Sequence, residues 1–213
     1  MTSTRSINMQ RRRERILAEA RAILAEQGFE ALNLRDLADI SEVTVPTIYN
    51  LIGNKEQVLQ ALMLGAFGDF EEELEKRLPC PAIGLAELMG DTLESLLAKD
   101  EAFYRASALA NERLESQPTQ HGNSGIRRET LRRYMGNLCQ VLLDDGLLKG
   151  QVSQELLVEQ MVSLHQVAFR DWAHRLIDLR EFRRTSLQGF YVTLAADATE
   201  EYHRQLIEAL NKL

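Results

Sequence analysis

Between residues 33 and 55 the sequence groups side chains that can contact the edges of bases or phosphate oxygens. Arginine can donate two hydrogen bonds to O6 and N7 of guanine, and asparagine pairs similarly with adenine. Hydroxyl groups and lysine contact phosphates, while apolar groups pack against the methyl group of thymine. The segment supplies these groups in Arg35, Thr44, Val45, Pro46, Thr47, Tyr49, Asn50 and Lys55. These residue types favour contact with nucleic acid if the local structure presents them together.

Two short helices joined by a tight turn would present these residues together. Asn33 can cap a helix over residues 34–40, residues 41–43 form the connection, and Thr44 can cap the following helix. Pro46 falls in the first turn of that helix, where its missing N–H is not needed. Small and apolar residues occupy the expected packing positions, namely Leu37, Ala38, Val43 and Ile48. The pattern predicts a helix-turn-helix unit, whose second helix enters the major groove of DNA.

Helical periodicity continues on both sides of this unit. A first helix is predicted from about Arg11 to the stop at Gly28, and a long helix from Asn54 to the boundary at residues 79–81. Later segments keep the helical spacing, and no strand pattern competes. The predicted fold is therefore all-α, with about nine to ten helices. Its predicted parts are a flexible N-terminal arm (1–10), a three-helix helix-turn-helix domain (11–53), a connecting helix (54–79) and a larger C-terminal helical domain (80–213).

The charge of the chain is unevenly distributed. The 213 residues carry a net charge of −7, but residues 1–60 are neutral, and residues 1–21 hold six arginines against two glutamates. Attraction to phosphate depends on local charge, so this distribution suits contact with DNA. Arg11-Arg12-Arg13 is equally compatible with a solvated helix start.

Location and redox state are also indicated by the composition. No apolar run is long enough to span a bilayer, and the polar N-terminus lacks a signal-peptide core. Cys80 and Cys139 lie far apart, which favours neither a disulfide framework nor a zinc site. We therefore expect a cytoplasmic protein with no membrane partner and no metal.

Residues 11–59 resemble the DNA-binding domain of the tetracycline-repressor (TetR) family. The resemblance covers about fifty residues and consists of features in a fixed register. These features are Ile16 and Ala20, Gly28-Phe29, Arg35-Asp36-Leu37-Ala38, Thr47-Ile48-Tyr49, and Lys55-Glu56. The rest of the chain is similar only in length, helicity and the small turn at residues 146–148.

Three positions depart from the family pattern. The family usually has Gly where this chain has Glu42, Phe where it has Ile52, and often His or Tyr where it has Leu51. Ile52 can replace an aromatic core residue at modest cost. A carboxylate at position 42 matters more, because close to the groove it would repel phosphate, unless it points to solvent.

The resemblance, together with side-chain chemistry, implies a role for each residue of the predicted DNA-binding set. Arg35 would read guanine, Asn50 adenine, and Thr47 a base or a phosphate, while Thr44, Val45 and Pro46 complete the tip of the second helix. Tyr49 and Lys55 would hold backbone phosphates, Lys55 with help from the positive end of its helix. Two alternatives stay open: Arg35 as a surface arginine paired with an acidic neighbour, and Tyr49 as a packing residue.

The resemblance also implies a homodimeric repressor that binds a (pseudo)palindromic double-stranded operator and leaves it when a small-molecule effector binds. No cofactor is expected. Pocket candidates are Met89, Leu93, Phe103, Tyr104, Tyr134, Leu138, His165 and Phe169. Dimer candidates, on the last two long helices, are Trp172, Phe190, Tyr191 and Leu194. Intramolecular packing is the alternative for each dimer candidate, and a core position is the favoured alternative for His165.

Other classes of protein find less support. Gly122-Asn123-Ser124-Gly125 is not a nucleophile elbow, and Gly53-Asn54-Lys55 lacks the upstream glycine of a phosphate loop. The four histidines show no metal-binding spacing on one helix, so we expect no enzyme. A helical protein-interaction adaptor with a vestigial DNA-binding head is the remaining alternative. The sequence does not distinguish activation from repression.

Overall fold

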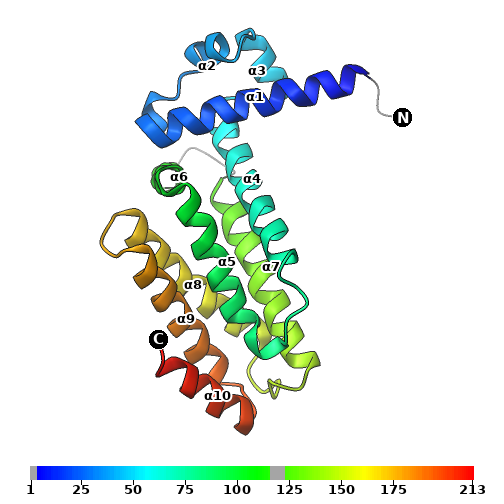
Figure 1. The fold of residues 1–213 in the computed structure, drawn as a ribbon, viewed down its shortest axis with the longest axis vertical. Helices are drawn as coiled ribbons and strands as arrows, with labels where there is room; N and C mark the ends of the chain where they lie inside the picture. Colours follow the sequence, from blue (N-terminus) through cyan, green and yellow to red (C-terminus); the bar gives the residue numbers. More distant parts are fainter. Residues whose placement is uncertain (1–3, 116–122) are drawn as a thin grey trace. The chain divides into compact units, whose positions relative to one another are not determined.

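The computed structural model describes residues 4–115 and 123–213, and within them it contains ten α-helices, two short 3₁₀ helices and no strand (Figure 1). The predicted all-α fold is confirmed. None of the helices in these two ranges combines the length and the apolar character that crossing a membrane requires.

The helices divide into two compact units. Unit 1 comprises the chain up to Asp69 together with the segment that begins at Asp100, and unit 2 comprises Phe70–Lys99 and the chain from Ser124 onward. The predicted boundaries at residues 53 and 79 therefore do not coincide with the division of contacts. Helix α4 (Lys55–Glu75) contributes to both units, and α6 (Glu101–Glu115) belongs to unit 1 rather than to a C-terminal domain that begins at residue 80.

Unit 1 is built around α1 (Thr4–Gln27). Ile16, Ala20 and Leu24, spaced by one helical turn, are fully buried. Helix α1 contacts α2 (Leu34–Ile40) and α3 (Val45–Leu51), and the 3₁₀ helix η1 (Phe29–Ala31) follows it. The helix begins at Thr4, so the prediction of a flexible arm over residues 1–10 was wrong for residues 4–10, where no Gly or Pro interrupts the helix.

Helix α6 is held against α1 by a half-buried cluster. Arg21 Nε donates to Asp100 Oδ2 at 2.8 Å, and the Arg21 guanidinium lies over the ring of Phe103, 3.9 Å from its centroid. Asp100 Oδ1 also accepts a hydrogen bond from the backbone N–H of Phe103 at 3.3 Å, which caps the start of α6. Since Phe103 is fully buried, this cluster joins α6 firmly to the unit that contains the helix-turn-helix.

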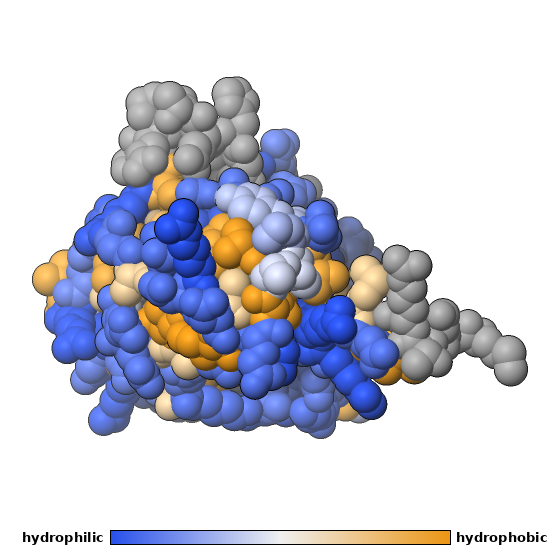
Figure 2. Space-filling view, turned by 90° about the horizontal axis from the view of Figure 1, so that it is seen from above, coloured by the Kyte–Doolittle hydropathy of each residue, from blue (hydrophilic) through white to orange (hydrophobic). Residues whose placement is uncertain are grey.

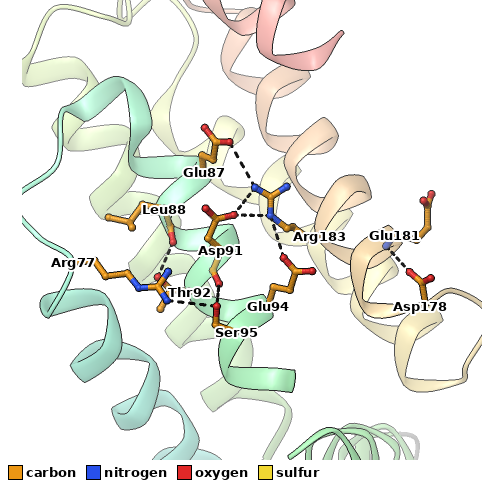
Figure 3. Close-up of polar contacts among 10 residues, drawn as sticks. All are labelled: Arg77, Glu87, Leu88, Asp91, Thr92, Glu94, Ser95, Asp178, Glu181 and Arg183. Atoms are coloured by element: carbon orange, nitrogen blue, oxygen red, sulfur yellow. Dashed lines mark hydrogen bonds and ion pairs between the residues drawn. The ribbon is translucent and has the colours of Figure 1, made fainter. Parts of the chain in front are cut away.

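Unit 2 contains the end of α4, the 3₁₀ helix η2 and five further α-helices. Their bounds are η2 Ala82–Gly84, α5 Leu85–Lys99, α7 Asn123–Asp144, α8 Gln154–Ala173, α9 Leu179–Ala195 and α10 Glu200–Leu210. An Arg183-centred ion-pair cluster connects α9 to α5, as Figure 3 shows. Arg183 Nε donates to Asp91 Oδ1 at 2.7 Å, and the guanidinium also lies 3.4 Å from Glu94 and 3.7 Å from Glu87.

A buried aspartate fastens two loops of unit 2 to each other. The carboxylate of Asp197, which is 1% exposed, accepts hydrogen bonds from the backbone N–H groups of Gly150, Gln151 and Val152 at 2.8–2.9 Å. An isolated antiparallel bridge between Leu148 and Ala198 adjoins these bonds. The carboxylate thus satisfies three backbone donors of the loop that leads into α8.

Helices α8 and α9 enclose an aromatic cluster. The His165 ring lies between Phe169 and Phe190 and meets Phe182 edge-on, with centroid distances of 5.5–6.2 Å. Ser186 Oγ is 3.4 Å from His165 Nδ1. Burial, with a smaller contribution from the positive charge of Arg127, lowers the pKa of His165 to about 3. The expectation that His165 is a core histidine fits this environment.

The buried neutral histidine makes acid destabilising. Between pH 6.5, the ordinary pKa, and pH 3 the unfolded chain binds a proton that the folded chain does not. Stability from this residue is therefore fully present above pH 6.5 and is lost as the pH falls. Relative to a His165→Phe variant, the protein should lose about 2 kcal/mol between pH 6.5 and 5, at about 1.4 kcal/mol per pH unit. Urea unfolding at several pH values measures this, and parallel pH profiles of the two proteins would contradict it.

Candidate DNA-binding site

Helix α3 is the part of unit 1 best placed to enter a groove. Ile48 is fully buried and holds one side of the helix against the rest of the unit. Pro46, Tyr49 and Asn50 are exposed on the other side, and Thr44, the N-cap residue, is exposed at the tip. The Thr44 and Thr47 hydroxyl oxygens lie 2.9 Å apart, so they hydrogen-bond to each other at the start of the helix. The arrangement leaves short polar groups at the N-terminus of α3 and larger groups one turn later.

Helix α2 presents Arg35 on the surface of the same unit. The side chain of Asn33 accepts a hydrogen bond from the Arg35 N–H at 2.8 Å, as expected for an N-cap, while Leu37 and Ala38 are buried. The Arg35 side chain is exposed and forms no ion pair within the described part of the chain. The alternative of an arginine paired with an acidic neighbour is thus not what the structure shows, and the guanidinium is available to a ligand.

Lys55 lies at the first residue of α4, and the start of that helix is tightly defined. Asn54 N–H donates to Gln57 Oε1 and Gln57 N–H donates to Asn54 Oδ1, both at 2.9 Å, which makes a reciprocal capping box. Gly53, with φ +130°, leaves room for the Gln57 side chain, which a β-carbon at this position would strike at 2.0 Å. This box was not predicted from the sequence.

The Lys55 ammonium group contacts the segment after α1. It donates to the backbone oxygen of Glu30 at 3.3 Å and lies 4.4 Å from the centroid of the Phe29 ring. An ammonium group has three donors, so two remain for a phosphate. The family-pattern residues Phe29 and Lys55 therefore act together, because the ring holds the lysine at the N-terminus of α4.

Glu42 occupies the turn between α2 and α3 in a left-handed conformation, with φ 51°. Glycine adopts this conformation without steric cost, which explains why the family usually has Gly here. The Glu42 side chain is exposed, and its carboxylate is paired: Arg15 Nη1 of α1 donates to its Oε2 at 2.8 Å. A second Arg15 nitrogen lies 3.5 Å from the Glu42 backbone oxygen. Sequence reasoning missed this pair, since 27 residues separate its members.

The surface around these residues is largely hydrophilic. Figure 2, a view from above relative to Figure 1, shows hydrophobic side chains grouped inside a hydrophilic surround. Arg11 and Arg12 of α1 are exposed, as are Ile40 and Tyr49 of α2 and α3. A mixture of basic and apolar groups around the α3 tip fits the phosphates and the thymine methyl groups of a duplex.

The predicted pocket residues are divided between the two units. Phe103 and Tyr104 of α6 belong to unit 1, where they pack against Arg21. The other candidates belong to unit 2: Met89, Leu93, Tyr134, Leu138, His165 and Phe169. Within unit 2, the Tyr134 hydroxyl donates to Glu71 at 2.9 Å, and burial raises the pKa of Tyr134 to about 12.

The burial of the four predicted dimer anchors within the single chain corrects their assignment to an interface. Trp172 and Leu194 are fully buried in the single chain, and Phe190 and Tyr191 are 3% and 5% exposed, so none of the four offers its side chain to a partner. The alternative, intramolecular packing, holds for all of them. The exposed apolar residues of α8 and α9 are instead Leu156, Leu164, Val167 and Val192.

The sequence of the α1–α4 region matches a known family. Residues 16–62 match the sequence model of the bacterial regulatory proteins of the tetR family. No curated protein matches the chain significantly.

Solved structures share the fold over most of the chain. SmeT, the repressor of the Stenotrophomonas maltophilia multidrug efflux pump SmeDEF, is 20% identical, with 89% of this chain and 92% of SmeT covered and a TM-score of 0.67. The fatty acid degradation regulator FadR from Bacillus halodurans is 17% identical, with 83% and 97% covered and a TM-score of 0.65. A tetR family transcription regulator from Shewanella sp. PV-4 is 17% identical, with 89% and 99% covered and a TM-score of 0.60.

At these identities the structural similarity shows the fold, while the match over residues 16–62 carries the family sequence. The shared fold and the family match both agree with the exposure of the α3 tip and of Arg35. Residues 16–62 therefore carry the DNA-binding sequence pattern of the bacterial regulatory proteins of the tetR family, and the chain shares the fold of solved tetR-family regulators.

Proposed function

We propose that the protein is a homodimeric repressor that binds a (pseudo)palindromic operator and releases it when a small-molecule effector binds. The observation that carries the proposal is the orientation of α3, whose buried Ile48 leaves Thr44, Pro46, Tyr49 and Asn50 exposed on one surface. In a helix-turn-helix, such a surface contacts base edges while the preceding helix crosses the backbone.

The proposed contacts divide into those that read sequence and those that hold the backbone. Arg35, whose guanidinium forms no ion pair with the residues that the structure describes, reads guanine, and Thr47 and Asn50 contact neighbouring bases. Tyr49 through its hydroxyl and Lys55 through its ammonium group hold phosphates, the latter at the positive end of α4. The four-residue tip of Thr44, Val45, Pro46 and Thr47 sets the fit of the helix against the groove.

The proposed dimer forms through α8 and α9. Leu156, Leu164 and Val167 lie on one side of α8 at spacings of eight and three residues, and all are at least 42% exposed. Val192 on α9 is 59% exposed. Exposed apolar residues gathered on two neighbouring helices indicate an interaction surface. A second copy is the occupant we infer, because two heads related by a two-fold axis can bind the two half-sites of an operator.

The proposed effector acts through the chain connections between the units. SmeT, which has the same fold, is a repressor and has been solved in complex with triclosan. In this chain the first segment of unit 2 ends with α5 at Lys99, and α6 of unit 1 begins at Glu101, one residue further on. An effector that displaces α5 would therefore displace α6 and the helix-turn-helix with it. Such control requires different effector affinities in the two states, typically a difference of about 1–3 kcal/mol.

The DNA contacts can be tested with a duplex selected from a random-sequence library by the full-length protein. Arg35→Ala should cost about 1–3 kcal/mol on the selected duplex and relax base preference at one position of each half-site. Lys55→Ala should weaken binding to selected and unrelated duplexes alike. It should also reduce the salt slope, which is the slope of the logarithm of the binding constant against the logarithm of the salt concentration, by about 0.9 per subunit. Fluorescence anisotropy titrations at several salt concentrations measure both effects.

Lys149→Ala, which removes an exposed positive charge in unit 2, is the matched control and should bind like the wild type. Wild-type behaviour of both Arg35→Ala and Lys55→Ala would discard the contact assignments. Failure of the wild type to select any duplex at low salt would favour the protein-interaction adaptor.

The dimer surface can be tested by placing a charge on it. Val167→Glu should convert the protein to a monomer in sedimentation-velocity experiments, because a carboxylate buried in an apolar interface loses its hydration. The same variant should bind a full operator at least tenfold more weakly, since one head then binds alone. Val141→Glu on α7, at a site 39% exposed, is the matched control and should remain a dimer. A dimeric Val167→Glu variant would place the interface elsewhere.

A further inference from the structure

We propose that the ion pair between Glu42 and Arg15 restrains DNA affinity, by occupying an arginine that would otherwise bind a backbone phosphate. The inference rests on the proposed DNA-binding function and concerns the same surface. It assigns to Glu42 the role of setting how strongly, and with what salt dependence, the protein binds any duplex.

Backbone conformation argues that Glu42 is not present for stability. A left-handed conformation is unfavourable for a residue with a β-carbon, and Glu42 has φ 51°. Its ion pair with Arg15 is solvent-exposed, with side chains 78% and 42% exposed. Exposed pairs of this kind contribute little to stability, less than the left-handed conformation costs. When a residue at a binding surface has a strained backbone conformation that its own contacts do not offset, a role in binding is indicated.

The position of the pair places it at the DNA-facing end of unit 1. Glu42 precedes the α3 N-cap, Thr44, by two residues, and Arg15 reaches it from α1. Arg11, four residues earlier on the same face of α1, is exposed and forms no ion pair among the described residues. A basic row on α1 therefore runs toward the turn, and its last member is neutralised by Glu42.

Competition between two anions follows from this geometry. A guanidinium binds carboxylate and phosphate with the same bidentate chemistry, so a duplex phosphate at the turn must displace the Glu42 carboxylate to engage Arg15. While the pair holds, Arg15 releases no counterion from DNA, and the carboxylate adds local repulsion. Removing the carboxylate frees one phosphate contact per subunit.

Glu42→Gln tests the inference, because it removes the charge while keeping the side-chain size and the backbone strain. The salt slope of binding to the library-selected duplex should steepen by about 0.9 per subunit, or about 1.8 for the dimer. The advantage of the variant over the wild type should then shrink about tenfold between 50 and 200 mM salt. An unrelated duplex should gain by the same factor. Thermal unfolding by circular dichroism checks that the fold is unchanged.

The double variant Glu42→Gln/Arg15→Gln decides whether the effect passes through Arg15. In this variant the extra salt slope should disappear. An unchanged slope for Glu42→Gln, or an increase that persists in the double variant, would overturn the inference. A loss of affinity in Glu42→Gln that is confined to one base position would instead show that Glu42 reads a base, which also overturns it. Because the wild type must first select a duplex, failure of the proposed function is recognised separately.

Discussion

The orientation of α3 depends on the burial of one side chain, Ile48. It lies between Thr47 and Tyr49 in a helix of only seven residues, and its complete burial against unit 1 fixes which side of the helix faces outward. A helix this short is not stable alone, so packing rather than propensity defines its direction. The neighbouring caps, at Asn33 and in the Asn54–Gln57 box, fix where α2 and α4 begin relative to it. The exposed reading residues follow from these local constraints.

Much of this local structure could be predicted from the sequence. The bounds of α2, the cap at Asn33 and the turn at residues 41–43 all follow from signals that lie within a few residues of one another. The start of α1 could not be predicted in this way, because residues 4–10 are polar but contain nothing that stops a helix. The division into units was also inaccessible, since α6 belongs to unit 1 through the contact of Asp100 with Arg21, 79 residues away.

The residues of the candidate site, like the helices, could be predicted from the sequence only in part. The residues proposed to contact DNA could be singled out from the sequence because their chemistry and helical register are local. The pairing of Arg35 could not be predicted, since only the tertiary structure shows that no acidic side chain within residues 4–115 and 123–213 pairs with it. Periodicity cannot tell a core stripe from an interface stripe on a helix with two apolar sides, and large aromatics suit both. Trp172 and Phe190 were therefore assigned to the interface although they are in the core, and the smaller exposed residues Leu164 and Val167 were overlooked.

The half-buried Arg21 cluster constrains how any signal can reach the reading tip. Its guanidinium is held both by the Asp100 carboxylate and by the Phe103 ring, and burial of Phe103 leaves little room for sliding of α6 on α1. Packed interiors resist continuous deformation. A change that begins at the α5–α6 connection would thus move α6 and α1 together as one body. The α2–α3 geometry would be preserved in such a movement, because both helices pack against α1.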